Sequence, residues 1–250
     1  MTSKNIYRQS WYTSRAGRLL ADAEKAELDK LLPQLYGFHL LHIAESSLAS
    51  FINSSLISNQ LMLNLAGRSH QAQPVVCAHL ENLPFLSNNI DVVVLTHALE
   101  QADCPHQILR EAHRILIPEG HLVITGFNPY SCWGLWIGLK KWLGKAPNHG
   151  KLLSLNRLRD WLKLLDFQVI GGGQFYFRPP LANVKWLNKL KFLEKWGARW
   201  WPFLGGAYTL VAVKRVVTLT PVQPSWRFKK SLWPQIQGVA GASQSLKRKQ

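Results

Sequence analysis

Cysteine is scarce in this chain of 250 residues, and its three copies, Cys77, Cys104 and Cys132, show no paired spacing. An odd number of cysteines without a secretory segment argues against a disulfide framework and for a reducing compartment. The first residues lack the apolar core of a signal peptide, and no apolar run approaches the length of a membrane span. The sequence therefore predicts a cytoplasmic protein, and it leaves peripheral attachment to a membrane open.

Acidic residues are scarce in the second half of the chain. Residues 1–130 contain 9 lysines and arginines against 11 acids, whereas residues 131–250 contain 21 against 3. Tryptophan divides in the same way, with Trp11 alone before residue 130 and ten copies after it. A basic and aromatic half attracts anionic or interfacial partners, so an anionic membrane surface is one expected partner. Nucleic acid ranks below it, because no nucleic-acid-binding motif is present.

Apolar runs of strand character alternate with segments of helical periodicity from residue 24 to residue 214. In one such unit, the mostly β-branched run 92–95 is followed by a helical pattern. Pro118 and Gly120 then predict a turn, and a second apolar run follows at 122–125. The predicted strands are 38–43, 60–65, 75–78, 92–95, 122–125, 167–170 and 208–214, and the predicted helices are 24–35, 48–57, 131–143 and 155–165. This alternation predicts a doubly wound, Rossmann-like α/β fold.

Two segments depart from the alternation. Leu181–Trp201 places tryptophan and leucine on one arc of a helical wheel and lysine and arginine mainly on the other. We expect it to be a helical insertion before the last strand, which either covers the core or lies on a membrane surface. From about Val217 the chain loses periodicity, which predicts a flexible basic tail. The expected division is a main domain over residues 1–216 and a tail over residues 217–250.

Several motifs in the middle of the chain occur in a known order. They are Leu83-Pro84-Phe85, Asp91, His97-x-Leu99-Glu100, Leu109-Arg110-Glu111 and the run Arg114-Ile-Leu-x-Pro-x-Gly120. In these motifs and their order, the chain resembles the class I S-adenosylmethionine-dependent methyltransferases, in a type 11-like bacterial subgroup, over most of residues 10–215. The resemblance implies a seven-stranded, mostly parallel sheet and S-adenosylmethionine as cofactor. It also implies methyl transfer to an unidentified acceptor, a small molecule or a lipid-like compound.

The turn after the first predicted strand lacks the glycines of that family. Ala44, Ser46 and Leu48 stand at the three glycine positions, and His42 replaces an acid. Glycine there normally allows positive φ and close approach of the backbone to the ligand. A catalytically degenerate member that acts as a binding or scaffolding module is therefore the alternative interpretation.

Carried over position by position, the resemblance assigns a role to each candidate site residue. Ala44, Glu45 and Ser46 would face the methionine end of the cofactor, and Asn64 the ribose. The adenine would lie against His79 and Leu80, and the transferred methyl would be flanked by Thr96 and His97.

Some residues have more than one interpretation. His97 either borders the methyl group or caps the next helix, and Glu100 is more typical of a structural acid than of a general base. His42, His79 and His97 follow strand ends, where a polar lining for a ligand is expected rather than a metal site. Gly171–Gly173 opens no helix and carries no Lys-Ser/Thr, so we expect a flexible turn rather than a phosphate loop.

Overall fold

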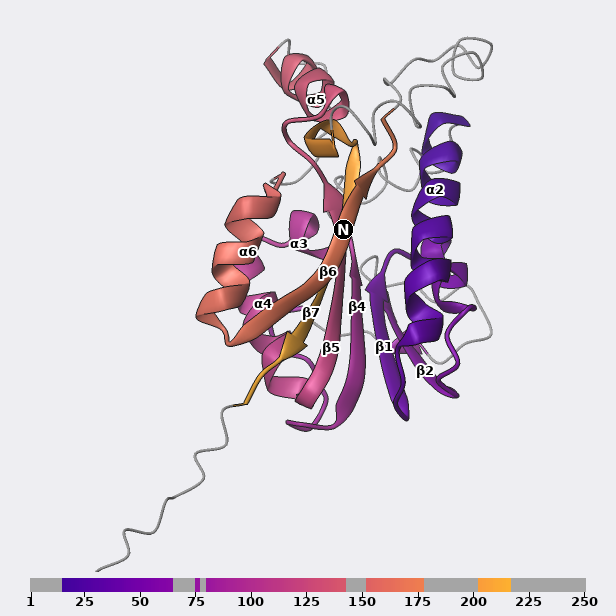
Figure 1. The fold of residues 1–250 in the computed structure, drawn as a ribbon, viewed down its shortest axis with the longest axis vertical. Helices are drawn as coiled ribbons and strands as arrows, with labels where there is room; N and C mark the ends of the chain where they lie inside the picture. The colour runs from indigo at the N-terminus through magenta and orange to yellow at the C-terminus, as the bar shows by residue number, and fades with distance from the viewer. Residues whose placement is uncertain (1–14, 65–74, 77–79, 143–151, 178–201, 217–250) are drawn as a thin grey trace, which may run out of the picture. The chain divides into compact units, whose positions relative to one another are not determined.

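A seven-stranded sheet forms the centre of the molecule. The computed structural model describes residues 15–64, 75–76, 80–142, 152–177 and 202–216. The strand order is β3-β2-β1-β4-β5-β7-β6, and β7 alone runs antiparallel to its neighbours (Figure 1). The strands are β1 (His39–Ala44), β2 (Asn59–Asn64), β3 (Val75–Val76), β4 (Ile90–Thr96), β5 (Leu116–Phe127), β6 (Phe167–Phe175) and β7 (Ala207–Lys214). The prediction of a seven-stranded, mostly parallel, Rossmann-like sheet is confirmed.

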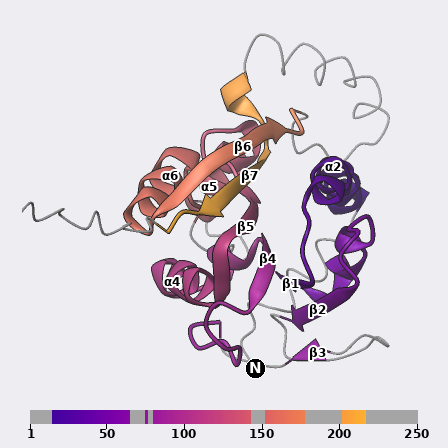
Figure 2. The same cartoon turned by 60° about the horizontal axis from the view of Figure 1, so that its bottom comes forward.

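Helical elements cover both faces of the sheet. One face carries α2 (Arg15–Leu31) with the 3₁₀ segments η1 (Leu32–Gln34) and η2 (Ser46–Ile52). The other carries α3 (Ala98–Gln101), α4 (Pro105–Ile115) and α6 (Leu155–Leu164), as Figures 1 and 2 show. The described part is completed by α5 (Cys132–Trp142) and η3 (Pro202–Leu204). Among the described residues, two large apolar cores result, one on each side of the sheet, and a smaller third cluster includes Leu20, Phe127 and Trp133.

Helix α4 shows how the local sequence produces an element. Pro105 occupies its first turn, where the missing N–H removes no helical hydrogen bond. Its apolar residues recur at helical spacing and all are buried against the sheet: Ile108, Leu109, Ala112 and Ile115. Asp103, two residues before Pro105, has the residue type of a helix cap and is the cap that the sequence predicts. That prediction is wrong, because Cys104 holds the N-cap position and no side chain caps the helix.

Several of the motifs that resemble the methyltransferase family have a structural role. The Arg114 guanidinium donates to the carbonyl oxygens of Leu83 and Phe85, each at 2.9 Å, and to the Glu111 carboxylate at 2.9 Å. Glu111 in turn accepts from the Leu83 backbone N–H at 3.0 Å. These contacts fasten the loop before β4 to α4, and the hydrogen bonds from Arg114 lower the pKa of Glu111.

Three sequence-based boundaries are wrong. Gly171–Gly173, expected to form a turn, lies inside β6 and pairs with β7. The helix expected at 48–57 is the 3₁₀ segment η2, which ends at Ile52. The turn expected at Pro118 and Gly120 lies within β5, where the register with β4 shifts.

The expected insertion at 181–201 and the expected tail at 217–250 lie outside the described residues, so both remain predictions. Within the described ranges, no helix combines the length and apolar character needed to cross a bilayer.

Candidate functional site

The carboxyl ends of β1, β2 and β4 bring most of the predicted site residues together. Ala44 ends β1 opposite Asn64, which ends β2, and Ile43 lies beside Leu95 of β4. The polar side chains at this edge are all nearly or fully buried: Glu45, Asn64, Thr96 and His97. Ligands of open α/β sheets bind at this edge, where the strand order reverses. The predicted location of the site therefore agrees with the topology.

His97 is the centre of a buried charged cluster. Its backbone has a φ of 53°, and its N–H donates to the Thr125 carbonyl at 2.9 Å. Its Nε2 lies 2.8 Å from Oε1 of Glu24 in α2, and its Nδ1 lies 3.4 Å from Oε2 of Glu100 in α3. The imidazole also stacks on Phe127, with ring centroids 4.3 Å apart. Three separate elements therefore fix the orientation of one ring.

The charge of this cluster follows from its environment. Burial by itself lowers the pKa of His97, but Glu24 and Glu100 oppose it and raise the pKa to about 9. His97 is therefore an imidazolium at neutral pH. Its positive charge is held between the carboxyl groups of Glu24 and Glu100.

Glu100 has a further structural partner. Its Oε1 accepts a hydrogen bond from the Phe127 backbone N–H at the end of β5. The Tyr208 hydroxyl lies nearby and donates to the Leu153 carbonyl at 3.3 Å. Burial and the Glu100 charge raise the pKa of Tyr208, so this phenol stays protonated. The interpretation of Glu100 as a structural acid agrees with these contacts.

His42 behaves in the opposite way to His97. It is fully buried, and its Nε2 lies 3.0 Å from the Thr96 hydroxyl. Burial without a counter-charge lowers its pKa to about 3, so the ring is neutral. Two histidines expected to line one polar site therefore carry different charges. Within the described ranges, no group of three metal-ligating side chains is found, and His79 lies outside those ranges.

The residues that replace the family's glycines are accommodated by the core. Ala44 and Leu48 are buried in the cluster formed with α2, together with Leu28 and Leu32. The chain leaves β1 through a 3₁₀ turn, in which the Leu48 N–H donates to the Glu45 carbonyl at 2.9 Å. The Leu48 side chain thus fills the layer between the sheet and α2.

Sequence reasoning missed Glu24, although a signal was present. Leu20, Glu24 and Leu28 stand at intervals of four, and all three are buried. A carboxylate in the middle of an apolar helical row needs a buried partner. Its partner, His97, is 73 positions away, so the pairing itself was not visible.

Comparisons with known proteins agree with this architecture. A family model described as a methyltransferase domain matches residues 37–124. The chain is 32% identical to the uncharacterized protein YafS of Escherichia coli K12, over 94% of this chain and 91% of that protein. A crystal structure of an S-adenosylmethionine-dependent methyltransferase from Thermotoga maritima shares the fold, with a TM-score of 0.63. It is 17% identical and matches 84% of this chain and 95% of its own. The chain belongs to the class I S-adenosylmethionine-dependent methyltransferases.

A more limited match concerns a methyltransferase with a named reaction. The mitochondrial 2-methoxy-6-polyprenyl-1,4-benzoquinol methylase of Caenorhabditis elegans is 35% identical over 78 residues. That match covers 28% of this methyltransferase and 27% of the relative.

S-adenosylmethionine is the cofactor of the family, and the residues at this edge fit it in kind. Asn64 and Glu45 offer hydrogen-bonding oxygens at the ends of two adjacent strands, and the buried Leu48 side chain is taken up by the core. Leu80 packs partly buried against the core on the α4 face. Ser46 begins η2, and His79 lies outside the described residues. The individual roles predicted for the site residues remain predictions.

Proposed function

We propose that this methyltransferase transfers a methyl group from S-adenosylmethionine to an unidentified acceptor at the carboxyl edge of β1, β2 and β4. The observation that carries the proposal is the convergence of Glu45, Asn64, Thr96 and His97 at this edge, in a chain of this family. The cofactor supplies a methyl group on a sulfonium, which is a very good leaving group. Alignment and exclusion of water by the protein then supply much of the rate.

In this proposal, each strand end has its own task. Asn64 would hydrogen-bond the ribose hydroxyls, and Glu45 with the turn at Ala44–Ser46 would lie toward the methionine end. Leu80 and His79 would border the adenine, and Thr96 and His97 the methyl group.

His97 would act as a positioning residue and not as a general base. An imidazolium between two carboxylates has no lone pair with which to accept a proton from the acceptor. Its ring instead holds α2 and the end of β5 in fixed positions beside the edge.

Calorimetric titration with S-adenosylmethionine and S-adenosylhomocysteine tests the proposal. We expect binding in the micromolar range, on the order of −8 kcal/mol. Asn64→Ala should weaken binding about tenfold, because it removes the hydrogen bonds to the ribose. Asn59→Ala, at the opposite end of β2, is the matched control and should leave it unchanged. Absence of binding to either compound would contradict the proposal.

A separate observation favours attachment to an anionic membrane surface. Helix α5 exposes Leu135, Leu139 and Trp142 by 68%, 53% and 82%, and their spacing places them on one face. Lys140 and Lys141 belong to the same helix. A helix with an apolar stripe, tryptophan and lysine suits the interface of an anionic bilayer. Such a location would suit a lipid-like acceptor, and the polyprenyl compound in the relative's name supports the same class.

Co-sedimentation with vesicles tests this attachment. We expect binding to phosphatidylglycerol vesicles and weaker binding to phosphatidylcholine vesicles, because the net charge of the chain is +16. Leu139→Glu and Trp142→Glu should abolish binding. Leu164→Glu places the same charge on an exposed leucine of α6 and should not. Equal binding by all variants would contradict the role of α5.

A further inference from the structure

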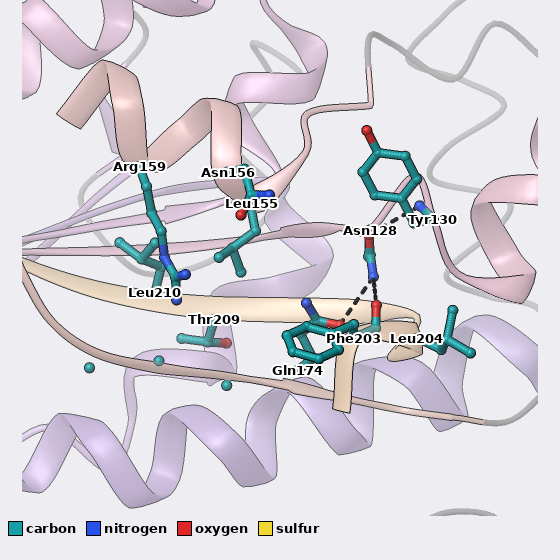
Figure 3. Close-up of a pocket in the computed structure, with 13 residues that line it drawn as sticks. Asn128, Tyr130, Leu155, Asn156, Arg159, Gln174, Phe203, Leu204, Thr209 and Leu210 are labelled. Atoms are coloured by element: carbon teal, nitrogen blue, oxygen red, sulfur yellow. Dashed lines mark hydrogen bonds between the residues drawn. The ribbon is translucent and has the colours of Figure 1, made fainter. Parts of the chain in front are cut away.

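A cavity of about 460 Å³ lies along the edge strand β6, away from the β1–β4 edge (Figure 3). Its floor is the backbone of Gly171–Gly173. One wall comes from α6, with Leu155, Asn156 and Arg159, and the others from Thr209 and Leu210 of β7 and from η3. The size is within the range of small-molecule sites, and the lining combines apolar surface with a few polar groups.

The three glycine positions differ in whether their surroundings leave room for a side chain. Gly172 has a φ of 146°, and a Cβ there would lie 2.4 Å from the Thr209 carbonyl oxygen, so the backbone requires glycine. A Cβ on Gly171 or on Gly173 would meet no atom within 4 Å. Neither the packing nor the space around these two positions calls for glycine. What their missing side chains do is keep the cavity open.

Two polar groups of the lining lack partners. The Thr209 side chain is 2% exposed, and its hydroxyl makes no hydrogen bond in the part of the chain that the structure describes. In Figure 3, Arg159 extends from α6 toward Leu210 on the sheet. Among the described residues, no hydrogen bond or ion pair is found for its guanidinium, whereas Arg114 and Arg215 are both paired. Thr209 and Leu210 are successive residues of β7, so the Thr209 side chain points to the sheet face opposite α6. On the α6 side of the cavity, the free Arg159 guanidinium is a ready donor for an anionic ligand oxygen.

One wall of the cavity is joined by hydrogen bonds to the end of β5. The Asn128 amide donates to Gln174 Oε1 and to the Phe203 carbonyl oxygen, at 3.1 and 2.8 Å (Figure 3). It also donates to the Gly205 carbonyl oxygen at 3.0 Å. Asn128 therefore ties the end of β5 to η3 and β6. It directly follows Phe127, whose ring stacks on His97.

We infer that this cavity binds an amphipathic organic anion, a compound with an apolar ring or chain and one carboxylate, sulfonate or phosphate group. The apolar part would lie on the bare glycine backbone between Leu155, Leu210 and Phe203, where a flat group can approach closely. The anionic group would meet the Arg159 guanidinium. This inference concerns a site separate from the β1–β4 edge, so it goes beyond the proposed methyl transfer and does not depend on it.

The probe for the experiment is 1-anilinonaphthalene-8-sulfonate, which has an apolar ring system and one anionic group. We expect saturable fluorescence enhancement with the full chain. Gly173→Leu should weaken binding at least tenfold, since it fills the cavity without a backbone clash. Arg159→Gln should weaken it about tenfold through loss of the ion pair. Lys163→Gln removes the same charge from the same helix outside the cavity and should bind like the wild type.

The outcomes separate this inference from its alternatives. Loss of the signal in Trp142→Glu, with both cavity variants unchanged, would locate the probe on α5 and overturn the inference. Absence of saturable binding to the wild type would also overturn it. Titration of the same variants with S-adenosylmethionine should give wild-type affinity. If the probe depends on Arg159 while the wild type binds no cofactor, the cavity stands and the proposed function fails.

Discussion

The two sides of the sheet's carboxyl edge treat polar groups in opposite ways. Beside β1 and β4, the side chains of Glu24, His97 and Glu100 are buried and paired. Leu48, which stands at a glycine position of the family, fills the core there with its side chain. At β6 and β7, two glycines leave open space, and Thr209 has a hydroxyl without a described partner. Paired and buried groups hold a structure, whereas open and unpaired ones remain available to a ligand. Substitutions should therefore be costly on the first side and, apart from Gly172, tolerated on the second.

The largest effect is expected from His97→Ala. Removing the imidazolium leaves two buried carboxylates without a cation, which costs about 4 kcal/mol of unfolding free energy. Urea denaturation measures it. His106→Ala, an exposed histidine beside Trp161, is the control and should change stability by less than about 1 kcal/mol. Equal losses of unfolding free energy in the two variants would show that the ion pairs of His97 do not stabilise the protein.

Leu48→Ala should be nearly as costly. The side chain is buried between the sheet and α2, so its truncation should cost about 3 kcal/mol in urea denaturation. Affinity for S-adenosylmethionine, followed by calorimetry, should not rise, because the leucine side chain is taken up by the core. A sharp rise in affinity would instead mean that Leu48 obstructs the cofactor.

The two buried histidines predict opposite pH dependences. The pKa of His97 is raised to about 9, so its contribution to stability is complete below pH 6.5 and is lost as the pH rises through 9. The pKa of His42 is lowered to about 3, so its contribution is complete above pH 6.5 and is lost as the pH falls toward 3. The His97 contribution amounts to up to about 3 kcal/mol.

Urea denaturation between pH 4 and pH 10 checks this opposition. Relative to the wild type, His97→Ala should remove much of the loss above neutral pH, and His42→Gln much of the loss below it. His113 and His121 also have pKa values lowered mainly by burial, so an acid slope will remain in both variants. An unchanged alkaline slope in His97→Ala would contradict the charge assigned to the cluster.

The smallest effect is a contrast within the glycine triplet. Gly172→Ala should cost about 2 kcal/mol, because the new Cβ meets the Thr209 carbonyl oxygen at a φ that side chains avoid. Gly173→Ala should change stability by less than about 0.5 kcal/mol, because its Cβ enters open space. Thermal unfolding of the two variants compares them directly. Equal shifts in unfolding temperature would contradict the difference between a crowded position at Gly172 and an open one at Gly173.

The fold was predictable because its signals are local. The mostly β-branched run at Val92–Leu95 and the apolar face of α4 are visible within a few residues, and both lie where they were expected. The Gly171–Gly173 strand was missed because glycine has a low strand propensity. Pairing with the fully buried β7 overrides that propensity, and this pairing is not a local property.

The site was only partly predictable. The ends of β1, β2 and β4 were placed at one edge from the chain order, and the structure brings Ala44, Glu45, Asn64, Thr96 and His97 there. The partners of these residues were not predicted. The sequence leaves His97 as a ligand neighbour or a helix cap. The structure places it at the N-cap position of α3 without a side-chain cap, and it adds an ion pair with α2 that the sequence did not show.

The sequence by itself determined the order of strands and helices, the motifs of the family and the replacement of its glycines, because these depend on residue type and short-range periodicity. Tertiary structure alone decided which charges are paired and which space stays empty. Glu24 contacts His97, which is 73 positions away in the sequence. Arg159 of α6 lines a cavity together with the glycines of β6. Coulomb energy and desolvation depend on distance and burial in three dimensions, and neither quantity is written in the local sequence.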